Sequence, residues 1–146
     1  MKPVKVLLVE DDVVDREAVR RAFKTNRIAN EIVEAENGRD ALDIMRGSAG
    51  APLQRPYVVL LDINMPVMDG FEFLDELRAD AELSDIVVFV LSTSGDQGDM
   101  FESYKRNVAG YMIKTIVGES FLEAIRLIEA YWRVVEMPDD SITRIR

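Results

Sequence analysis

Short, nearly uninterrupted apolar runs alternate along this chain with longer segments whose apolar residues recur at helical spacing. The apolar runs, each predicted to be a strand, are 4–9, 31–35, 58–61, 86–91 and 110–113. Such runs are typical of strands buried on both faces of a parallel sheet, where a crossover helix joins each strand to the next. We expect the last helix to span about 120–136. The pattern therefore predicts an α/β sandwich with a parallel sheet and right-handed crossovers.

The composition narrows the possible classes of function. The 146 residues are 48% hydrophobic and 31% charged, which suits a folded chain with one core. A formal net charge of −9 disfavours nucleic acid as a partner, because binding phosphates needs clustered Lys and Arg. The chain has no cysteine and no histidine, which excludes disulfides, thiolate or imidazole metal sites, and Ser-His or Cys-His nucleophiles. Carboxylates, hydroxyls and lysines must therefore do any chemistry.

The chain is predicted to be one domain over 1–137, followed by a tail, 138–146, that is too short to be an output domain. The Gly- and Pro-rich stretch 47–56 is predicted to be a long loop within that domain. The apolar runs are far shorter than the roughly 20 residues that a membrane span needs. Acidic residues also come too early for a signal peptide. We therefore expect a cytoplasmic protein with no membrane association.

Carboxylates follow two of the predicted strands at the edge where open parallel sheets bind ligands. The first strand runs into Glu10, Asp11 and Asp12, and the third runs into Asp62. If these strands are neighbours, the carboxylates repel one another and a cation would relieve the repulsion. Hard oxygen ligands without His or Cys favour Mg²⁺. Alternatively, Asp11 or Asp12 caps the following helix, since Asp is a preferred N-cap residue.

A hydroxyl and an ammonium group follow two further strands. Ser92 ends the fourth predicted strand and Lys114 follows the fifth. Alone, they would be an ordinary loop hydroxyl and a solvated surface lysine. Together with Asp62 and a second acid, they are the parts of a site that receives a phosphoryl group. There the carboxylate attacks, the metal and ammonium neutralise charge, and the hydroxyl binds an oxygen.

Four ordered motifs resemble those of the receiver domain of two-component response regulators. They are VLLVEDD at 6–12, LLDINMPVMDG at 60–70, VLSTS at 90–94 and GYMIK at 110–114. The likeness covers the chain from 5 to about 136. It implies a flavodoxin-like, doubly wound sheet of five parallel strands in the order 2-1-3-4-5.

The resemblance also implies a function centred on Asp62. This residue would take a phosphoryl group from the phosphohistidine of a partner sensor histidine kinase, and the protein would signal through protein contacts. Phosphotransfer and autodephosphorylation would be self-catalysed, so the protein would not be a turnover enzyme. The resemblance assigns the Mg²⁺ ligands to Glu10, Asp11, Asp62 and the backbone carbonyl of Asn64.

Three further residues acquire roles from the resemblance. Lys114 would pair with Asp62 and then with its phosphoryl group, and Ser92 would hydrogen-bond a phosphoryl oxygen. Tyr111 would turn inward as Ser92 moves and so couple the site to the surface. Its alternative role is that of an ordinary half-buried aromatic.

One position departs from the family pattern. The family commonly has a cis proline directly after the lysine, whereas this chain has Thr115. A cis bond before a non-proline residue costs about 3 kcal/mol, so we expect a trans bond and a rearranged loop over 115–118. With this departure, the long loop 47–56, and a last helix that ends in Tyr131-Trp132 before Met137-Pro138, the chain resembles the stand-alone regulators that partner phytochrome-type, light-sensing histidine kinases. A bacteriophytochrome is therefore a candidate kinase.

The last predicted helix has more apolar surface than packing on one sheet requires. One apolar stripe of this helix is predicted to face the sheet. A second, adjacent stripe is predicted to be the interface of a homodimer, because two-fold contacts are the commonest oligomer interface. Alternatively, the tail from Met137 folds back over this stripe in a monomer. The stripe consists of Ala124, Leu127, Tyr131 and Val134.

Three other functions fit the residues less well. An aspartate-nucleophile phosphatase usually has a second Asp two residues after the first, where this chain has Asn64. A flavodoxin-like cofactor module would place a phosphate beside the acids at 10–12, which would repel it. A receiver-like binding platform that is not phosphorylated, or a phosphate sink, is the alternative to a phosphorylated regulator.

Overall fold

The computed structural model describes residues 4–48, 50–114, 126 and 130. Strands and helices alternate throughout the described part of the chain. In chain order they are β1 (Lys5–Val9), α1 (Val13–Thr25), β2 (Ile32–Ala35), α2 (Gly38–Arg46), β3 (Tyr57–Leu61), α3 (Gly70–Ala79), β4 (Val88–Ser92), α4 (Gln97–Lys105) and β5 (Gly110–Ile113). Within these residues, no helix is long and apolar enough to cross a membrane.

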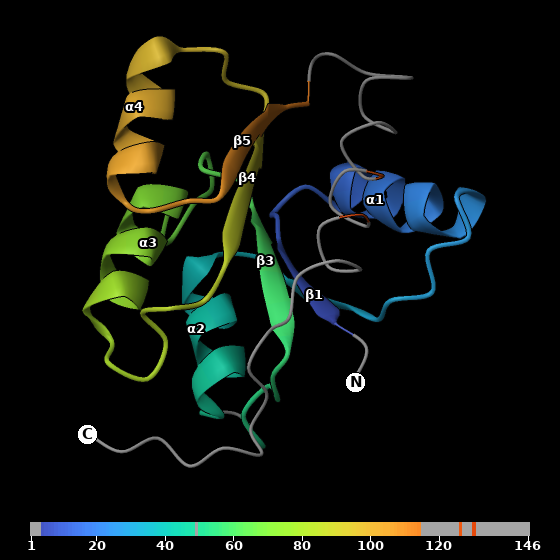
Figure 1. Cartoon of the computed structure of the whole chain (residues 1–146), viewed down its shortest axis with the longest axis horizontal. Helices are drawn as coiled ribbons and strands as arrows, with labels where there is room; N and C mark the ends of the chain where they lie inside the picture. The colour runs from blue at the N-terminus through green and yellow to red at the C-terminus, as the bar shows by residue number, and fades with distance from the viewer. Residues whose placement is uncertain (1–3, 49, 115–125, 127–129, 131–146) are drawn as a thin grey trace.

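The strands form one five-stranded sheet in the order β2-β1-β3-β4-β5. Every pairing is parallel, and the central pair aligns Val9 of β1 with Leu61 of β3. Figure 1 shows α1 on one side of this sheet and α2, α3 and α4 on the other. The doubly wound α/β fold and the strand order predicted from the sequence are therefore confirmed.

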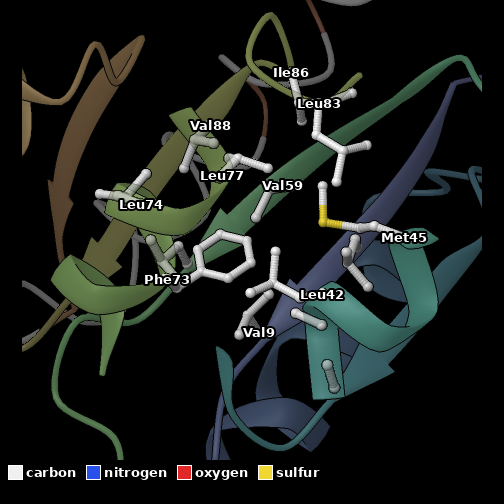
Figure 2. Close-up of a cluster of buried hydrophobic side chains, with 14 of the residues drawn as sticks. Val9, Leu42, Met45, Val59, Phe73, Leu74, Leu77, Leu83, Ile86 and Val88 are labelled. Atoms are coloured by element: carbon white, nitrogen blue, oxygen red, sulfur yellow. The ribbon is translucent and has the colours of Figure 1, made fainter. Parts of the chain in front are cut away.

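Alternate residues of the central strands supply two separate cores, one on each face of the sheet. Towards α1, buried side chains of β1 and β3 pack with Phe23 and its helical neighbours. Towards α2 and α3, the intervening residues of the same strands pack around Phe73 and Leu42 (Figure 2). Strands with a core on both sides must be apolar at every position, which explains the uninterrupted runs in the sequence.

The fourth strand differs from its predicted bounds of 86–91. It spans Val88–Ser92, because Ile86 belongs to the preceding turn, where its N–H donates to the carbonyl of Leu83 at 3.1 Å. Ile86 is nevertheless buried in the core beside α2 and α3. Apolar periodicity alone does not separate a buried turn residue from a strand residue.

The predicted loop at 47–56 begins where α2 ends. Gly47 closes that helix with a φ of +79°, in the left-handed region that glycine adopts without strain. Farther along the loop, the carbonyl of Gln54 accepts a hydrogen bond from Lys5 Nζ at 2.7 Å. Lys5 begins β1, so this loop lies at the opposite end of the sheet from the strand ends that carry the predicted site.

Candidate metal centre

Neighbouring strands bring the predicted carboxylates together. Glu10 directly follows β1 and Asp62 directly follows β3, and these two strands pair side by side. The Asp62 N–H donates to the carbonyl of Val9 at 3.0 Å, which continues the ladder into the site. Carboxylate oxygens of Glu10, Asp11 and Asp62 all lie within 4.8 Å of one another.

The three carboxylates differ in burial. Glu10 and Asp62 are 2% and 7% exposed, whereas Asp11 is exposed. Burial raises the pKa of Glu10 to about 7. The hydrogen bond from Lys114 lowers this pKa in part, and the negative charge of Asp62 raises it. Burial also raises the pKa of Asp62, although the charge of Lys114 lowers it in part. The site therefore holds negative charge that is poorly solvated.

This donor set fits a hard divalent cation. Three clustered carboxylate oxygens suit Mg²⁺ or Mn²⁺, which prefer oxygen ligands. The open side at Asp11 leaves access for waters or a phosphoryl oxygen, and Mg²⁺ usually retains several waters. Asn64, the predicted carbonyl ligand, donates its backbone N–H towards Asp62 Oδ1 at 3.4 Å, and its side chain is exposed.

The start of α1 shows which of the two neighbouring acids caps the helix. Asp12 is the N-cap residue, and its Oδ1 accepts hydrogen bonds from the N–H groups of Val14 at 2.8 Å and Asp15 at 3.3 Å. Asp11 instead belongs to the carboxylate group. The neighbouring acids thus separate into a helix cap and a candidate ligand.

Lys114, which follows β5, reaches across the sheet edge to this group. Its Nζ pairs closely with Glu10, lies 2.9 Å from Asp15 Oδ2, and lies 3.8 Å from Asp62 Oδ2. Burial alone lowers the pKa of Lys114, but the hydrogen bond to Glu10 and the charge of Asp62 raise it overall. The lysine therefore stays charged within the site.

Asp15 is the residue of this arrangement that the sequence analysis missed. It lies in the first turn of α1, three residues after the cap. An acid at this position is common for another reason, because its negative charge interacts favourably with the helix dipole. No local pattern pointed to it, because Asp15 joins the site through Lys114, which lies 99 residues away in the sequence.

Ser92 and Tyr111 lie at the ends of β4 and β5. Ser92 is fully buried, its Oγ accepts from the Ser94 N–H at 3.2 Å, and its carbonyl accepts from the Lys114 N–H at 2.6 Å. Tyr111 is half-buried, and its hydroxyl donates to the carbonyl of Ser94 at 2.8 Å. Both residues thus contact Ser94 in the loop after β4, and the predicted coupling between them stays a prediction.

A five-stranded parallel sheet with acids after β1 and β3 and a lysine after β5 defines a receiver domain. The model of the response regulator receiver domain family matches residues 6–126, and the chain belongs to this family. The family resemblance predicted from the motifs is therefore confirmed, and members of this family are generally signalling proteins rather than enzymes.

Some relatives match over most of their length. The chain is 32% identical to the response regulator Rcp1 of Synechocystis over 133 residues, 89% of each chain. It is 33% identical to a probable methanogenesis regulatory protein, FilR2, of Methanothrix harundinacea, over 89% of this chain and 84% of that one. The phosphorylated cyanobacterial phytochrome response regulator RcpA superposes with a TM-score of 0.80 at 30% identity, covering 96% of this chain and all of that one.

A solved structure of Rcp1 contains a metal. Its Mn²⁺-bound form has a TM-score of 0.79 with this chain at 31% identity, and the match covers 93% of this chain and 99% of that one. Receiver domains thus bind a divalent metal, and the cluster of Glu10, Asp11 and Asp62 provides carboxylate oxygens for one in this chain.

Proposed function

We propose that this protein is a stand-alone response regulator in which Asp62 accepts a phosphoryl group from the phosphohistidine of a partner sensor histidine kinase. The observation that carries the proposal is the meeting of three carboxylates and one ammonium group at a single sheet edge. Similarity to RcpA, which has been solved in a phosphorylated form, supports it.

In the proposed transfer, an Oδ atom of Asp62 attacks the phosphorus atom of the kinase phosphohistidine. The new P–O bond forms as the P–N bond breaks, and the imidazole leaves with that electron pair and takes up a proton. Asp62 must be ionised to attack. Its pKa is raised by burial and lowered by the charge of Lys114, so the lysine favours the reactive form.

Each neighbouring group has a separate proposed role. Lys114 moves from its carboxylate partners to the phosphoryl group, whose negative charge it neutralises. The Ser92 hydroxyl donates to a phosphoryl oxygen, and Tyr111 turns inward as Ser92 moves. Bound Mg²⁺ would offset charge on the transferred oxygens. Its proposed ligands are Glu10, Asp11, Asp62 and the backbone carbonyl of Asn64.

We further propose a phytochrome-type histidine kinase as the partner. Two similar proteins support this assignment: RcpA is a phytochrome response regulator, and AtBRR, a bacteriophytochrome response regulator, matches with a TM-score of 0.72 at 30% identity. Residues 1–137 would form the receiver domain, and the signal would pass through protein contacts in the cytoplasm. The predicted homodimer through Ala124, Leu127, Tyr131 and Val134 involves residues outside the described part of the chain and stays a prediction.

The direct test is intact mass spectrometry after incubation with acetyl phosphate and Mg²⁺. We expect one phosphoryl group to be added to the parent protein and to Asp40→Asn, a matched control in the first turn of α2. Addition should be lost in Asp62→Asn and in the presence of a chelator. Unchanged addition in Asp62→Asn would refute the assignment, and no addition to the parent, either from acetyl phosphate or from a phosphorylated kinase, would favour the binding-platform alternative.

A further inference from the structure

The ammonium group of Lys114 is held by two carboxylates, neither of which is the proposed phosphoacceptor. Nζ pairs with Glu10 and with Asp15, whose Oδ2 is 2.9 Å away, whereas Asp62 Oδ2 is 3.8 Å away. An N–H···O hydrogen bond is normally 2.7–3.2 Å long, so the contact with Asp62 is an ion pair without a hydrogen bond. The lysine therefore lies displaced from Asp62 towards Glu10 and Asp15.

The backbone around Asp15 is anchored at the end of β1. Asp12 caps the first turn of α1, which contains Asp15. The next residue, Arg16, anchors the same turn to the strand end, because its guanidinium donates to the carbonyls of Glu10 at 2.8 Å and Asp11 at 3.2 Å. This turn thus holds the backbone of Asp15 beside the strand end, where its carboxylate lies 2.9 Å from Lys114 Nζ.

The two partners of Lys114 differ in how readily they can release it. The Glu10 side chain is 3% exposed, so an unpaired charge there would be poorly solvated. The Asp15 side chain is 37% exposed and lies outside the cluster of Glu10, Asp11 and Asp62. Water can therefore solvate Asp15 when the lysine leaves it. Breaking the Lys114–Asp15 ion pair thus costs less free energy than breaking the Lys114–Glu10 pair.

A phosphoryl group on Asp62 would compete with Asp15 for the lysine. It brings further negative charge and strong acceptor oxygens next to Nζ, which has three N–H donors. Asp15 and Asp62 both lie within 4 Å of that nitrogen, so the Asp15 charge also repels an approaching phosphate. Both effects of Asp15 oppose phosphorylation.

We propose that Asp15 is a positioning residue that holds Lys114 away from Asp62 and so slows its phosphorylation. This inference rests on the proposed function, because it concerns the same transfer to Asp62. Asp15 acts through Lys114 and through its own charge, and it is not a metal ligand. Removing its charge should therefore speed phosphoryl uptake when Mg²⁺ is saturating.

The test compares Asp15→Asn with the parent, with Asp15→Glu, and with Glu17→Gln, which removes one exposed charge from the same helix. The rate of phosphorylation is measured by intact mass at acetyl phosphate concentrations below saturation, and at a Mg²⁺ concentration that calorimetry shows to be saturating for each protein. We expect Asp15→Asn to react about threefold faster, consistent with the modest strength of a partly exposed ion pair. Asp15→Glu and Glu17→Gln should react at the parent rate.

A rate gain separates this role from a structural one, since a damaged fold lowers the rate. An Asp15→Asn rate equal to or below the parent rate would overturn the inference while leaving the proposed function intact, because the parent would still be phosphorylated. An equal gain in Glu17→Gln would also overturn it, since the effect would then be one of net charge. A parent that takes up no phosphoryl group would remove the proposed function, and this inference with it.

Discussion

Substituting Glu10 with Gln should change how the stability of the metal-free protein depends on pH. Burial raises the pKa of Glu10 from 4.5 to about 7 in the folded protein, while in the unfolded chain it stays near its ordinary value. Between these values the folded state binds more protons than the unfolded state. The contribution of Glu10 to stability is therefore greatest below about pH 4.5 and is lost as the pH rises through about 7.

The size of this effect follows from the pKa. A difference between 4.5 and about 7 corresponds to about 3 kcal/mol, at about 1.4 kcal/mol per pKa unit. Asp62 contributes in the same direction, because burial also raises its pKa. The pKa of Lys114 is raised, so the lysine stays charged between pH 5 and 8 and adds no slope there.

Urea denaturation with a chelator present, at pH 5, 6, 7 and 8, measures the effect directly. We expect the free energy of unfolding of Glu10→Gln, minus that of the parent, to grow by up to about 3 kcal/mol from pH 5 to pH 8. Glu17→Gln, an exposed acid on α1, should follow the parent at every pH. Parallel curves for Glu10→Gln and the parent would show that Glu10 carries no such cost and would refute the reasoning.

Substitutions at three further positions test the packing and the hydrogen bonds that support the site. A Cβ on Gly70 would lie 2.5 Å from Cα of Ile63, so Gly70→Ala should lower the free energy of unfolding by about 2 kcal/mol in urea; an unchanged midpoint would disprove the close approach. Arg78 donates hydrogen bonds to four backbone carbonyls just before β4 and β5. Arg78→Met should therefore lower the free energy of unfolding by about 3 kcal/mol in urea. A decrease of less than about 1 kcal/mol would mean that water satisfies these carbonyls in place of the guanidinium. Asp12→Ala removes the α1 cap and should cost about 1 kcal/mol in thermal unfolding, which Asp12→Asn should largely avoid; equal losses in both variants would contradict a capping role.

Much of the fold followed from local patterns. Strands buried on both faces must be apolar along their length, so β1 and β3 were visible as runs, and helical spacing marked the crossovers between strands. Parallel strands end at a common edge, so the residues after them were expected to meet. The cluster of Glu10, Asp11 and Asp62 lies at this edge.

Other features depend on contacts between segments that are distant in the sequence. The bounds of β4 were not predictable from hydrophobicity, because Ile86 is buried in a turn rather than in the strand. The roles of Asp11 and Asp12 could not be separated by residue type, since either carboxylate suits a cap or a metal, and only the direction of the first turn of α1 distinguishes them.

The fold class, the order of the strands through the family motifs, and the acids and lysine at the strand ends could all be predicted from the sequence. Which of these charges pair depends on how distant segments pack. Lys114 lies 99 residues from Asp15 and 104 from Glu10, and its nitrogen contacts both. Periodicity specifies which face of an element a residue occupies, but not the distance between side chains on different elements, which packing sets.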